Sequence, residues 1–426
     1  MRKLFDSRSA YTLLLWLLLP YVLFHLLWRA RKQPEYLKHI GERFGRYAVH
    51  TDKPVIWLHT VSVGETRAAA TLVQRLREHY PDHQLLLTHT TPTGRATSEQ
   101  LYGGDVIRVY LPYDYPFAVQ RFLHHFQPRV GVLLETEVWF NLIHQSHVMQ
   151  IPLLLLNARL SEKSAARYAR FPRLTHRGLH ELYIIAAQTD DDAQRLAGLS
   201  GRAVPTMGNL KFDIAPPKAM LELGAALRTQ FGTQRPVFLA ASTREGEEAL
   251  LLDALLHADV GRLLVVIVPR HPQRFDEVAT LIERHALRMQ RRSANETIAA
   301  DTQVVLGDSM GELFAYYAAC DLAFIGGSLL AFGGQNLIEA CAVGKPVLIG
   351  PHTYNFAQAT EQAVASGAAM QVKHADDLVH QLNILLQDAA HLEQMGQAGM
   401  QFVSDNQGAT GRALNHIALA LHEHLV

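Results

Sequence analysis

Several acidic residues of this chain lie where predicted strands end, a position that suits catalytic carboxylates. Glu65 stands between a short apolar segment and a predicted helix, and Glu135 and Glu137 lie at the end of the apolar segment that begins at residue 130. A carboxylate placed in this way can act as a general base. Ser62 and Glu65 also have the spacing of a capping box, and from spacing alone we favour the cap. Strand alternation would turn Glu135 and Glu137 to opposite faces, so that one can cap a helix and the other can serve a site.

Two basic residues are candidates for contacts with an anionic leaving group. Lys211 lies in the segment 208–220, which interrupts the pattern of strands and helices, and Arg270 follows Pro269 at the end of a predicted strand. A lysine at the mouth of a cleft can stabilise negative charge, and arginine suits bidentate contacts with phosphate. The alternatives are a solvated lysine in a linker and an arginine in a salt bridge at the rim.

A predicted helix start in the second half of the chain offers backbone donors to a nucleotide. The helix is expected to open at Met310 and Gly311, with Glu312 in its first turn. N–H groups at such a start can bind a base or a ribose. Capping by Asp308 or Ser309 explains the same residues without any ligand.

The strongest local signal is the segment 325–340, which reads IGGSLLAFGGQNLIEA. A predicted strand runs into a glycine-rich loop and then into a helix begun by Asn336. Loop N–H groups and a helix dipole predict a phosphate site. Glu339 can hold ribose hydroxyls or complete a cap with Asn336. The glycine spacing is neither GxGxxG nor a Walker A loop, which argues against NAD use and ATP hydrolysis.

These residues are connected by a regular alternation of apolar segments and amphipathic helices. Continuous apolar strands between helices predict parallel sheets covered on both faces, the doubly wound α/β pattern. The pattern stops at 208–220, where Pro216 and Pro217 mark a linker, and then restarts. We therefore expect two Rossmann-like domains, with ligands beyond the carboxyl ends of the strands. The predicted strands are 54–59, 84–90, 105–112, 130–136, 151–157 and 182–188, and then 236–242, 262–269, 302–307, 322–328 and 345–351.

Length and charge agree with a two-domain protein that has no special affinity for nucleic acid. The chain has 426 residues, more than one hydrophobic core usually serves. Lys plus Arg and Asp plus Glu are 40 each, so the basic excess of a dedicated nucleic-acid binder is missing. Cys320 and Cys341 lie in apolar segments and are expected to be small buried side chains. No cluster of metal-ligand spacing is present in the sequence.

The N-terminal segment is long and apolar enough to enter a membrane. Residues 10–28 contain few polar side chains and have about the ~20 residues that cross a bilayer. Basic residues follow at 29–32 instead of a signal-peptidase site, which argues against a cleaved signal peptide. Their position favours a cytoplasmic body. Pro20 keeps a monotopic anchor as an open alternative.

A series of short motifs occurs in an order that resembles the 3-deoxy-D-manno-octulosonic acid (Kdo) transferase family. The resemblance covers almost the whole chain, and the ordered set is more specific than any single motif. The motifs are SVGET at 62–66, TPTG at 91–94, YLPYD at 110–114, ETE at 135–137, NARLS at 157–161, GNLKFD at 208–213, PRHP at 269–272, GDSMGEL at 307–313, FIGGSL at 324–329 and GPHTYNF at 350–356.

This resemblance implies a GT-B fold, with two Rossmann-like domains facing a cleft, and a reaction. The reaction is the inverting transfer of Kdo from CMP-Kdo to the tetraacylated lipid A precursor, in the synthesis of the lipopolysaccharide inner core. Glu65 is implied as the base, and Glu135 and Lys211 as residues that stabilise the transition state. No cofactor or metal is implied. The segments implied in CMP binding are Pro269 and Arg270; Met310, Gly311 and Glu312; and Asn336, Leu337, Ile338 and Glu339.

The resemblance and the apolar segment together predict the layout of the chain. We expect an N-terminal membrane anchor at 1–32, an acceptor domain at 33–210 and a donor domain at 211–426. The anchor is expected to contact membrane lipids of the inner membrane, with the catalytic body on the cytoplasmic face.

The chain differs from the family pattern at a few positions. Phe140 stands where members carry Pro, Gln335 where they carry His, and Leu337-Ile338 where they carry Pro-Leu. These differences concern the geometry of the phosphate loop and leave Asn336 and Glu339 in place. Two alternatives stay open: another GT-B enzyme, such as a different lipid glycosyltransferase or a nucleotide-sugar epimerase, and a membrane-tethered nucleotide-binding module without catalysis.

Overall fold

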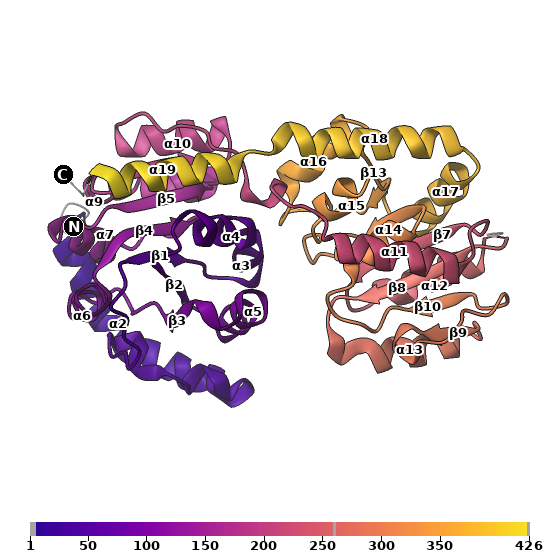
Figure 1. The fold of residues 1–426 in the computed structure, drawn as a ribbon, viewed down its shortest axis with the longest axis horizontal. Coiled ribbons are helices and arrows are strands. Elements are labelled where there is room, and N and C mark those ends of the chain that lie inside the picture. The colour runs from indigo at the N-terminus through magenta and orange to yellow at the C-terminus, as the bar shows by residue number, and fades with distance from the viewer. Residues whose placement is uncertain (1–5, 259–260, 424–426) are drawn as a thin grey trace. The chain divides into compact units, whose positions relative to one another are not determined.

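The structure is a computed structural model that describes residues 6–258 and 261–423. The chain forms two compact units (Figure 1). The first unit runs to Asp213 and resumes at Gln407, and the second unit is Ile214–Asn406. The chain therefore leaves the first unit within the segment 208–220 that reads as a linker, and it returns to that unit before its last helix.

The first unit contains a parallel sheet of six strands in the order β3-β2-β1-β4-β5-β6. This order is that of the doubly wound fold expected from the alternation of apolar segments and helices. The strands are β1 (Val55–His59), β2 (Gln84–His89), β3 (Ile107–Tyr110), β4 (Pro128–Leu134), β5 (Leu153–Ala158) and β6 (Ile184–Ala187).

Side chains of each central strand alternate between two apolar cores, which is why these strands are apolar throughout. In β1, Ile56 and Leu58 belong to one core, and Val55 and Trp57 belong to the other. Helices cover both faces of the sheet, and the segment after β1 forms two short helices that are separated at Ala69. The helices are α3 (Val63–Ala68), α4 (Ala70–His79), α5 (Pro92–Tyr102), α6 (Pro116–Phe126), α7 (Phe140–Val148), α8 (Glu162–Tyr168), α9 (Pro172–His180), α10 (Asp190–Ser200) and α19 (Ala409–Glu423), with 3-10 turns η1 (Pro34–Leu37), η2 (Ile40–Phe44), η3 (Gly103–Asp105) and η4 (Leu210–Phe212).

The last helix, α19, packs with the first unit, although the sequence placed it in the second domain. It contacts α4, β4 and β5, beside which Figure 1 shows it in yellow. Ala413, Ile417 and Ala420 are fully buried in the same core as Ile56 and Leu58. Burial of this apolar face assigns the helix to the first unit.

The second unit contains a parallel sheet of seven strands in the order β13-β12-β11-β7-β8-β10-β9. The short strands at its two edges were not expected from the sequence, because three-residue strands with partly exposed side chains carry no apolar segment. The strands are β7 (Val237–Thr243), β8 (Leu264–Pro269), β9 (Met289–Arg291), β10 (Val304–Leu306), β11 (Leu322–Ile325), β12 (Val347–Ile349) and β13 (Ala369–Gln371).

Helices again cover both faces of this sheet. Phe238, Ile267 and Phe324 lie at the centre of an apolar core beneath α12, α13 and α17. Cys320 and Cys341 are buried as single thiols, as expected. The helices are α11 (Lys218–Phe231), α12 (Glu247–Leu256), α13 (Phe275–Arg284), α14 (Leu313–Ala319), α15 (Ile338–Ala342), α16 (Ala357–Ala365), α17 (Ala375–Leu386) and α18 (Ala389–Asn406), with 3-10 turns η5 (Pro272–Arg274) and η6 (Arg292–Ala294).

The N-terminal apolar segment forms one long helix, α2 (Arg8–Lys32), with Pro20 inside it. Its composition and length suffice to cross a membrane, and most of its side chains are exposed. Its first half is fastened to the first unit. Tyr11 donates a hydrogen bond to Asp114 (2.9 Å), and Tyr115 donates one to the carbonyl of Leu15 (2.8 Å). The second half projects away from the sheet of that unit (Figure 1).

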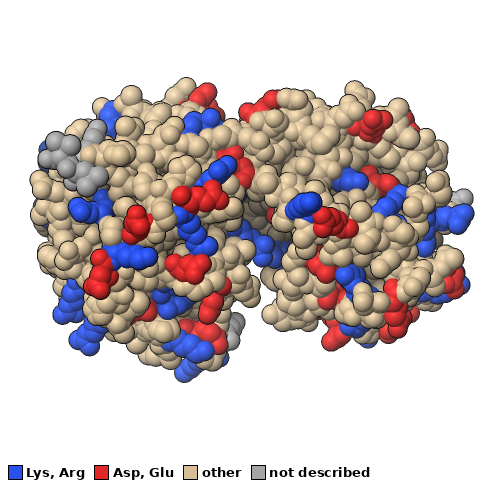
Figure 2. Space-filling model, viewed as in Figure 1, with Lys and Arg blue, Asp and Glu red and all other residues tan. Residues whose placement is uncertain are grey.

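The charged side chains are mixed on the face of the two units that Figure 2 shows. Basic and acidic residues alternate over this face, and no large area of it carries one sign. Such a surface agrees with equal numbers of basic and acidic residues in the chain.

Candidate active site

Both sheets have a topological switch point, where the order of the strands reverses direction. In the first unit this point lies between β1 and β4, and in the second it lies between β7 and β11. Ligands of open α/β sheets bind beyond the carboxyl ends of the strands at such points. Glu65 follows β1 and Glu135 follows β4, whereas the glycine-rich loop follows β11.

Glu65 lies at the first turn of α3 and is 9% exposed. Its carboxylate accepts hydrogen bonds from the Val61 N–H (2.7 Å) and the Ser62 hydroxyl (2.9 Å), and the Glu65 N–H donates to Ser62 Oγ (3.2 Å). The capping interaction is therefore present. Burial, and then the charge of Glu135, raise the pKa of Glu65 to about 7, although these two donors oppose the rise. A carboxylate with this pKa can accept a proton near neutral pH.

Glu135 and Lys211 form an ion pair at the end of β4, with 3.2 Å between Lys211 Nζ and Glu135 Oε1. The backbone of Glu135 has a φ of +62°, in the left-handed region that residues other than glycine rarely adopt. Such a backbone costs about 1–3 kcal/mol and persists where surrounding contacts hold it, often at functional sites. The turn ends the strand before Glu137, so the simple alternation expected for the two glutamates does not apply.

Asn157, at the end of β5, fixes the loop that carries Lys211. Its side-chain oxygen accepts a hydrogen bond from the Leu210 N–H (3.1 Å), and Asn209 accepts one from the Lys211 N–H (3.0 Å). Asn157 also has a positive φ of +54°. The sequence offered Asn157 only as part of a motif, because its partners lie far along the chain.

Glu137 points to a buried histidine and does not cap the following helix. Its Oε2 accepts a hydrogen bond from Trp139 Nε1 (2.6 Å) and lies 3.8 Å from Nε2 of His59. The first N–H groups of α7 are instead bound by Asp114, which accepts from Asn141 and Leu142. His59 is fully buried at the end of β1 and was not predicted as a site residue.

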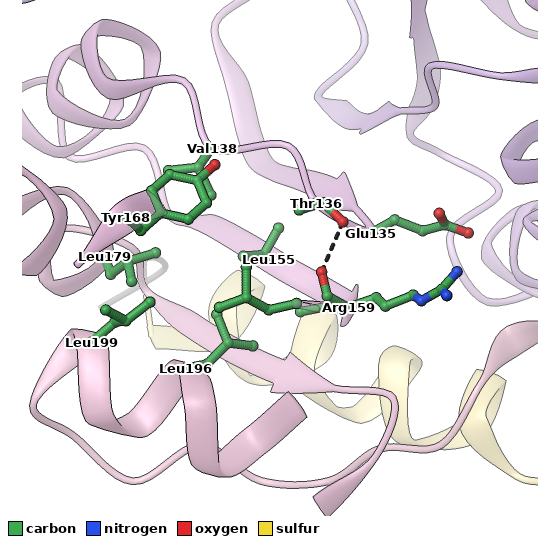
Figure 3. A pocket seen from close by; sticks show the side chains of 11 residues that line it. Glu135, Thr136, Val138, Leu155, Arg159, Tyr168, Leu179, Leu196 and Leu199 are labelled. Atoms are coloured by element: carbon green, nitrogen blue, oxygen red, sulfur yellow. Dashed lines mark hydrogen bonds between the residues drawn. The ribbon is translucent and has the colours of Figure 1, made fainter. Parts of the chain in front are cut away.

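A small apolar pocket lies behind Glu135, as Figure 3 shows. Leu155, Leu179 and Leu196 are among the side chains that line it, and Thr136 donates a hydrogen bond to the Arg159 carbonyl (2.8 Å) at its edge. The side chains of Glu135 and Arg159 extend in the same direction, away from the leucines. Arg159 therefore adds an exposed cation beside the Glu135 carboxylate.

In the second unit, Arg270 lies where β8 ends at Pro269. Its N–H donates to the Thr243 carbonyl (3.0 Å), and its Nε donates to Oε1 of Gln335 (3.2 Å). These contacts connect the end of β8 with the glycine-rich loop.

Met310, Gly311 and Glu312 precede α14, which begins at Leu313, so the helix starts later than expected. Met310 is exposed and Gly311 has a φ of +84°. The Glu312 carboxylate binds Arg292 (3.2 Å) and accepts a hydrogen bond from Ser309 (2.7 Å). These residues therefore form a turn that exposes the Met310 side chain, and the contacts of Glu312 with Arg292 and Ser309 hold the turn in place.

The segment from Asn336 to Glu339 also differs from the expected helix start. The helix α15 begins at Ile338 and has five residues, so its dipole is small. Asn336 accepts a hydrogen bond from the Ile338 N–H (3.1 Å) and donates one to Glu339 (3.1 Å), which is a capping arrangement. Leu337 is buried between them.

The glycine-rich loop uses its backbone donors inside the chain. The N–H groups of Gly327 and Leu329 donate to the Glu247 carboxylate (2.6 and 2.9 Å). Those of Gly334 and Gln335 donate to loop carbonyls (2.7 and 3.1 Å). The sequence predicted that N–H groups of this loop bind a phosphate, whereas these four N–H groups bind acceptors of the chain itself.

Among residues 6–258 and 261–423, no group of three or more His, Cys, Asp or Glu side chains could hold a metal ion. The structure brings Glu65, Glu135 and Lys211 together in the first unit. It brings Arg270 next to Gln335, and so to the segment that starts at Asn336, in the second.

Sequence comparison finds one family over most of the chain. A family profile described as "3-Deoxy-D-manno-octulosonic-acid transferase (kdotransferase)" matches residues 38–214, and a profile for glycosyl transferases group 1 matches residues 282–402. A 3-deoxy-D-manno-octulosonic acid transferase of Bordetella pertussis is 41% identical over 424 residues, 96% of this chain and 98% of that protein. Its counterpart in Haemophilus influenzae is 37% identical over 96% of this chain and 97% of its own length.

Structure comparison agrees on the fold. A UDP-GlcNAc 2-epimerase of Neisseria meningitidis, solved with UDP-GlcNAc, covers 86% of this chain and 99% of its own at a TM-score of 0.58. A glycosyltransferase of Rickettsia africae covers 88% of this chain and 97% of its own at 0.56. Because the sequence identities are only 15% and 14%, these two comparisons show a similar fold and nothing more. The fold is therefore shared by epimerases and transferases, and the sequence relatives separate the two.

Proposed function

Because the chain belongs to the 3-deoxy-D-manno-octulosonic acid (Kdo) transferase family, we propose that it moves Kdo from CMP-Kdo onto a hydroxyl of the tetraacylated lipid A precursor. The chain is a glycosyltransferase with two Rossmann-like domains, and it acts in lipopolysaccharide synthesis. The observation that carries the mechanism is the group formed by Glu65, Glu135 and Lys211 at the switch point of the first unit.

In this mechanism Glu65 is the general base. It accepts the proton of the acceptor hydroxyl as the hydroxyl oxygen forms a bond to the anomeric carbon of Kdo. The bond between that carbon and the phosphate oxygen breaks, CMP leaves with the electron pair, and the configuration inverts. The raised pKa of Glu65 supports this assignment, because a base works best when its pKa lies near the operating pH.

Glu135 and Lys211 provide opposite charges where charge develops during the displacement. Lys211 holds a positive charge that can stabilise the leaving phosphate, and Glu135 holds a negative charge for the electron-poor anomeric carbon. Their 3.2 Å ion pair holds the two side chains next to each other.

Donor binding is assigned to the second unit. Pro269 and Arg270 would hold the phosphate of CMP, since arginine forms charge-assisted contacts with phosphate. The turn of Met310, Gly311 and Glu312 would contact the base. The segment Asn336, Leu337, Ile338 and Glu339 would contact the ribose and phosphate.

The helix α2 would anchor the enzyme in the inner membrane from the cytoplasmic side, as a monotopic anchor. Its first half packs on the first unit as far as Trp16, whose ring lies 5.1 Å from that of Tyr115, and Leu26 and Ala30 are buried in its second half. The remaining helix, from Leu17 to Lys32, is about 24 Å long at ~1.5 Å per residue, shorter than the ~30 Å hydrocarbon core. A cysteine introduced by Ser7→Cys should react with an impermeant maleimide only from the side of the catalytic body. Reaction from the opposite side would show that the helix spans the membrane.

Product analysis tests the reaction itself. The purified full chain, CMP-Kdo and the tetraacylated precursor in mixed micelles should give a lipid that has gained Kdo, detected by mass spectrometry. CMP release should depend on the lipid. Release that is equally fast without lipid would contradict transfer, and an epimerised sugar nucleotide would identify an epimerase.

Replacement of the base tests the mechanism. Glu65→Gln should lower the transfer rate by about 10²–10⁴-fold, the usual contribution of a general base, and should still bind CMP-Kdo in calorimetry. Glu162→Gln, an exposed glutamate on α8, is the control and should keep normal turnover. Near-normal turnover of Glu65→Gln would exclude Glu65 as the base.

A further inference from the structure

The glycine turn at 326–329 is organised by a buried carboxylate from another part of the chain. Glu247, the first residue of α12, is fully buried. One of its oxygens accepts from the Gly327 N–H (2.6 Å) and the Arg244 N–H (2.9 Å), and the other accepts from the Leu329 N–H (2.9 Å). Glu247 thus takes the place that an anion would occupy in an anion-binding turn of this kind.

Within the described part of the chain, no Lys or Arg side chain forms an ion pair with Glu247, and backbone N–H groups stabilise the charge of its carboxylate instead. Burial raises the pKa of Glu247 above its ordinary value, whereas the backbone donors of Gly327, Arg244 and Leu329 oppose the rise. Hydrogen bonds from backbone N–H groups to a carboxylate are charge-assisted and stronger than neutral ones. Three of them converge on one side chain here.

The turn held by Glu247 in turn holds the second half of the glycine-rich loop. The Gly334 N–H donates to the Gly327 carbonyl (2.7 Å), and the Gln335 N–H donates to the Gly326 carbonyl (3.1 Å). Gly327 has a φ of +69°, and a Cβ there would approach the Gln335 side chain to 3.1 Å. The position of Gln335 is therefore coupled directly to the conformation of Gly327.

Gln335 completes the route, because its Oε1 accepts a hydrogen bond from Arg270 Nε (3.2 Å). A continuous set of contacts thus runs from Glu247 through Gly327 to Gln335 and Arg270. Asn336 follows Gln335 directly in the chain, so the same turn also sets the start of the segment assigned to the nucleotide.

The adjacent Glu248 provides a natural contrast. It is also fully buried, but its carboxylate binds the Arg274 guanidinium (2.7 and 3.0 Å) and accepts from the Thr243 hydroxyl (2.6 Å). None of these contacts involves the glycine-rich loop. Glu248 therefore has the burial and the charge of Glu247 without its connection to Gln335.

We propose that Glu247 is a positioning residue for the nucleotide-sugar donor: it fixes the glycine turn at 326–329 and thereby places Gln335 and Arg270 for the donor phosphate. The proposal rests on the proposed function, which assigns donor binding to the second unit. The phosphate would bind the Arg270 side chain. The N–H groups of Gly327 and Leu329 are not available to it, because they donate to Glu247.

Calorimetric titration with CMP, using the full-length chain in detergent, tests this role. Glu247→Gln should weaken CMP binding by about tenfold or more, because an amide nitrogen replaces an acceptor oxygen beside a backbone donor. In turnover assays the KM for the donor should rise similarly while kcat changes little. Glu248→Gln is the matched control: it should lower the thermal unfolding midpoint and leave the CMP dissociation constant within about twofold, since the loop contacts remain.

The outcomes separate this inference from the proposed function. Wild-type protein that does not bind CMP would overturn the proposed function and this inference with it. Wild-type protein that binds CMP, with equal affinity in Glu247→Gln or equal weakening in both variants, would overturn the inference alone. If Glu247→Gln does not fold, Gln335→Ala tests the same route at a partly exposed residue. Unchanged CMP binding in that variant would also overturn the inference.

Discussion

At the scale of single residues, Glu65 combines a structural and a chemical role. Its contacts with Val61 and Ser62 are those of a helix cap, and they also hold the carboxylate in one orientation. Because burial raises its pKa to about 7, the same group is only partly ionised at neutral pH. The capping and catalytic interpretations of the Ser62–Glu65 spacing are therefore compatible.

The raised pKa predicts a pH dependence of the transfer rate. The base acts in its ionised form, so kcat should fall about tenfold per pH unit below a midpoint near 7. The charge of Glu135 contributes to the rise in pKa, so Glu135→Gln should move the midpoint of its residual activity to lower pH. Glu137→Gln is the control and should keep the wild-type midpoint. A wild-type midpoint close to 4.5, or an unchanged midpoint in Glu135→Gln, would contradict this account.

The sequence could single out Glu65, Glu135 and Lys211 as candidates because each lies in a local motif at a strand end or linker, and the resemblance to the family implied their roles. It could not identify Glu247, which lies 80 residues before Gly327 in the chain. A carboxylate that binds backbone donors leaves no pattern in the sequence, since any residue can supply an N–H group. For the same reason the sequence predicted a phosphate site at the glycine-rich loop, although part of the loop already binds the Glu247 carboxylate.

At the scale of secondary-structure elements, the apolar pattern predicted the central strands and the doubly wound α/β class. It missed the edge strands β9 and β13, most of whose side chains are partly or fully exposed and so need not be apolar. It also did not show that α2 is fastened to the first unit. That attachment depends on Asp114, whose carboxylate binds both the start of α7 and the hydroxyl of Tyr11.

This attachment predicts unequal effects of two similar substitutions on α2. Tyr11→Phe removes the hydrogen bond to the buried Asp114 and should lower the free energy of unfolding by about 1–3 kcal/mol. Tyr21→Phe, on the same helix but 63% exposed, should change it by less than about 0.5 kcal/mol. Thermal unfolding in one detergent compares them. Equal stability of the two variants would show that the hydrogen bond from Tyr11 to Asp114 does not stabilise the fold of the unit.

At the scale of the whole molecule, the chain crosses between the units twice, and Asp213 at the first crossing binds the backbone at the second. The carboxylate of Asp213, the last residue before the second unit, accepts hydrogen bonds from the N–H groups of Gly408 (2.6 Å) and Thr410 at the start of α19. From the sequence we predicted a single domain boundary, because the apolar pattern of the last two helices does not indicate which of the two cores they pack against. Membership of α19 follows only from its burial against the first sheet.

The return of the chain predicts that a substitution near the C-terminus destabilises the N-terminal unit. Ile417→Ala removes a fully buried side chain from the core that contains Ile56 and should cost about 2–5 kcal/mol. Leu419→Ala, two residues later and 55% exposed, should cost less than about 0.5 kcal/mol. Hydrogen exchange should rise in β1 and β4 of the Ile417→Ala variant, while CMP binding, which we propose for the second unit, stays unchanged. Faster exchange confined to the second unit would instead place α19 in the second domain, where the sequence prediction had put it.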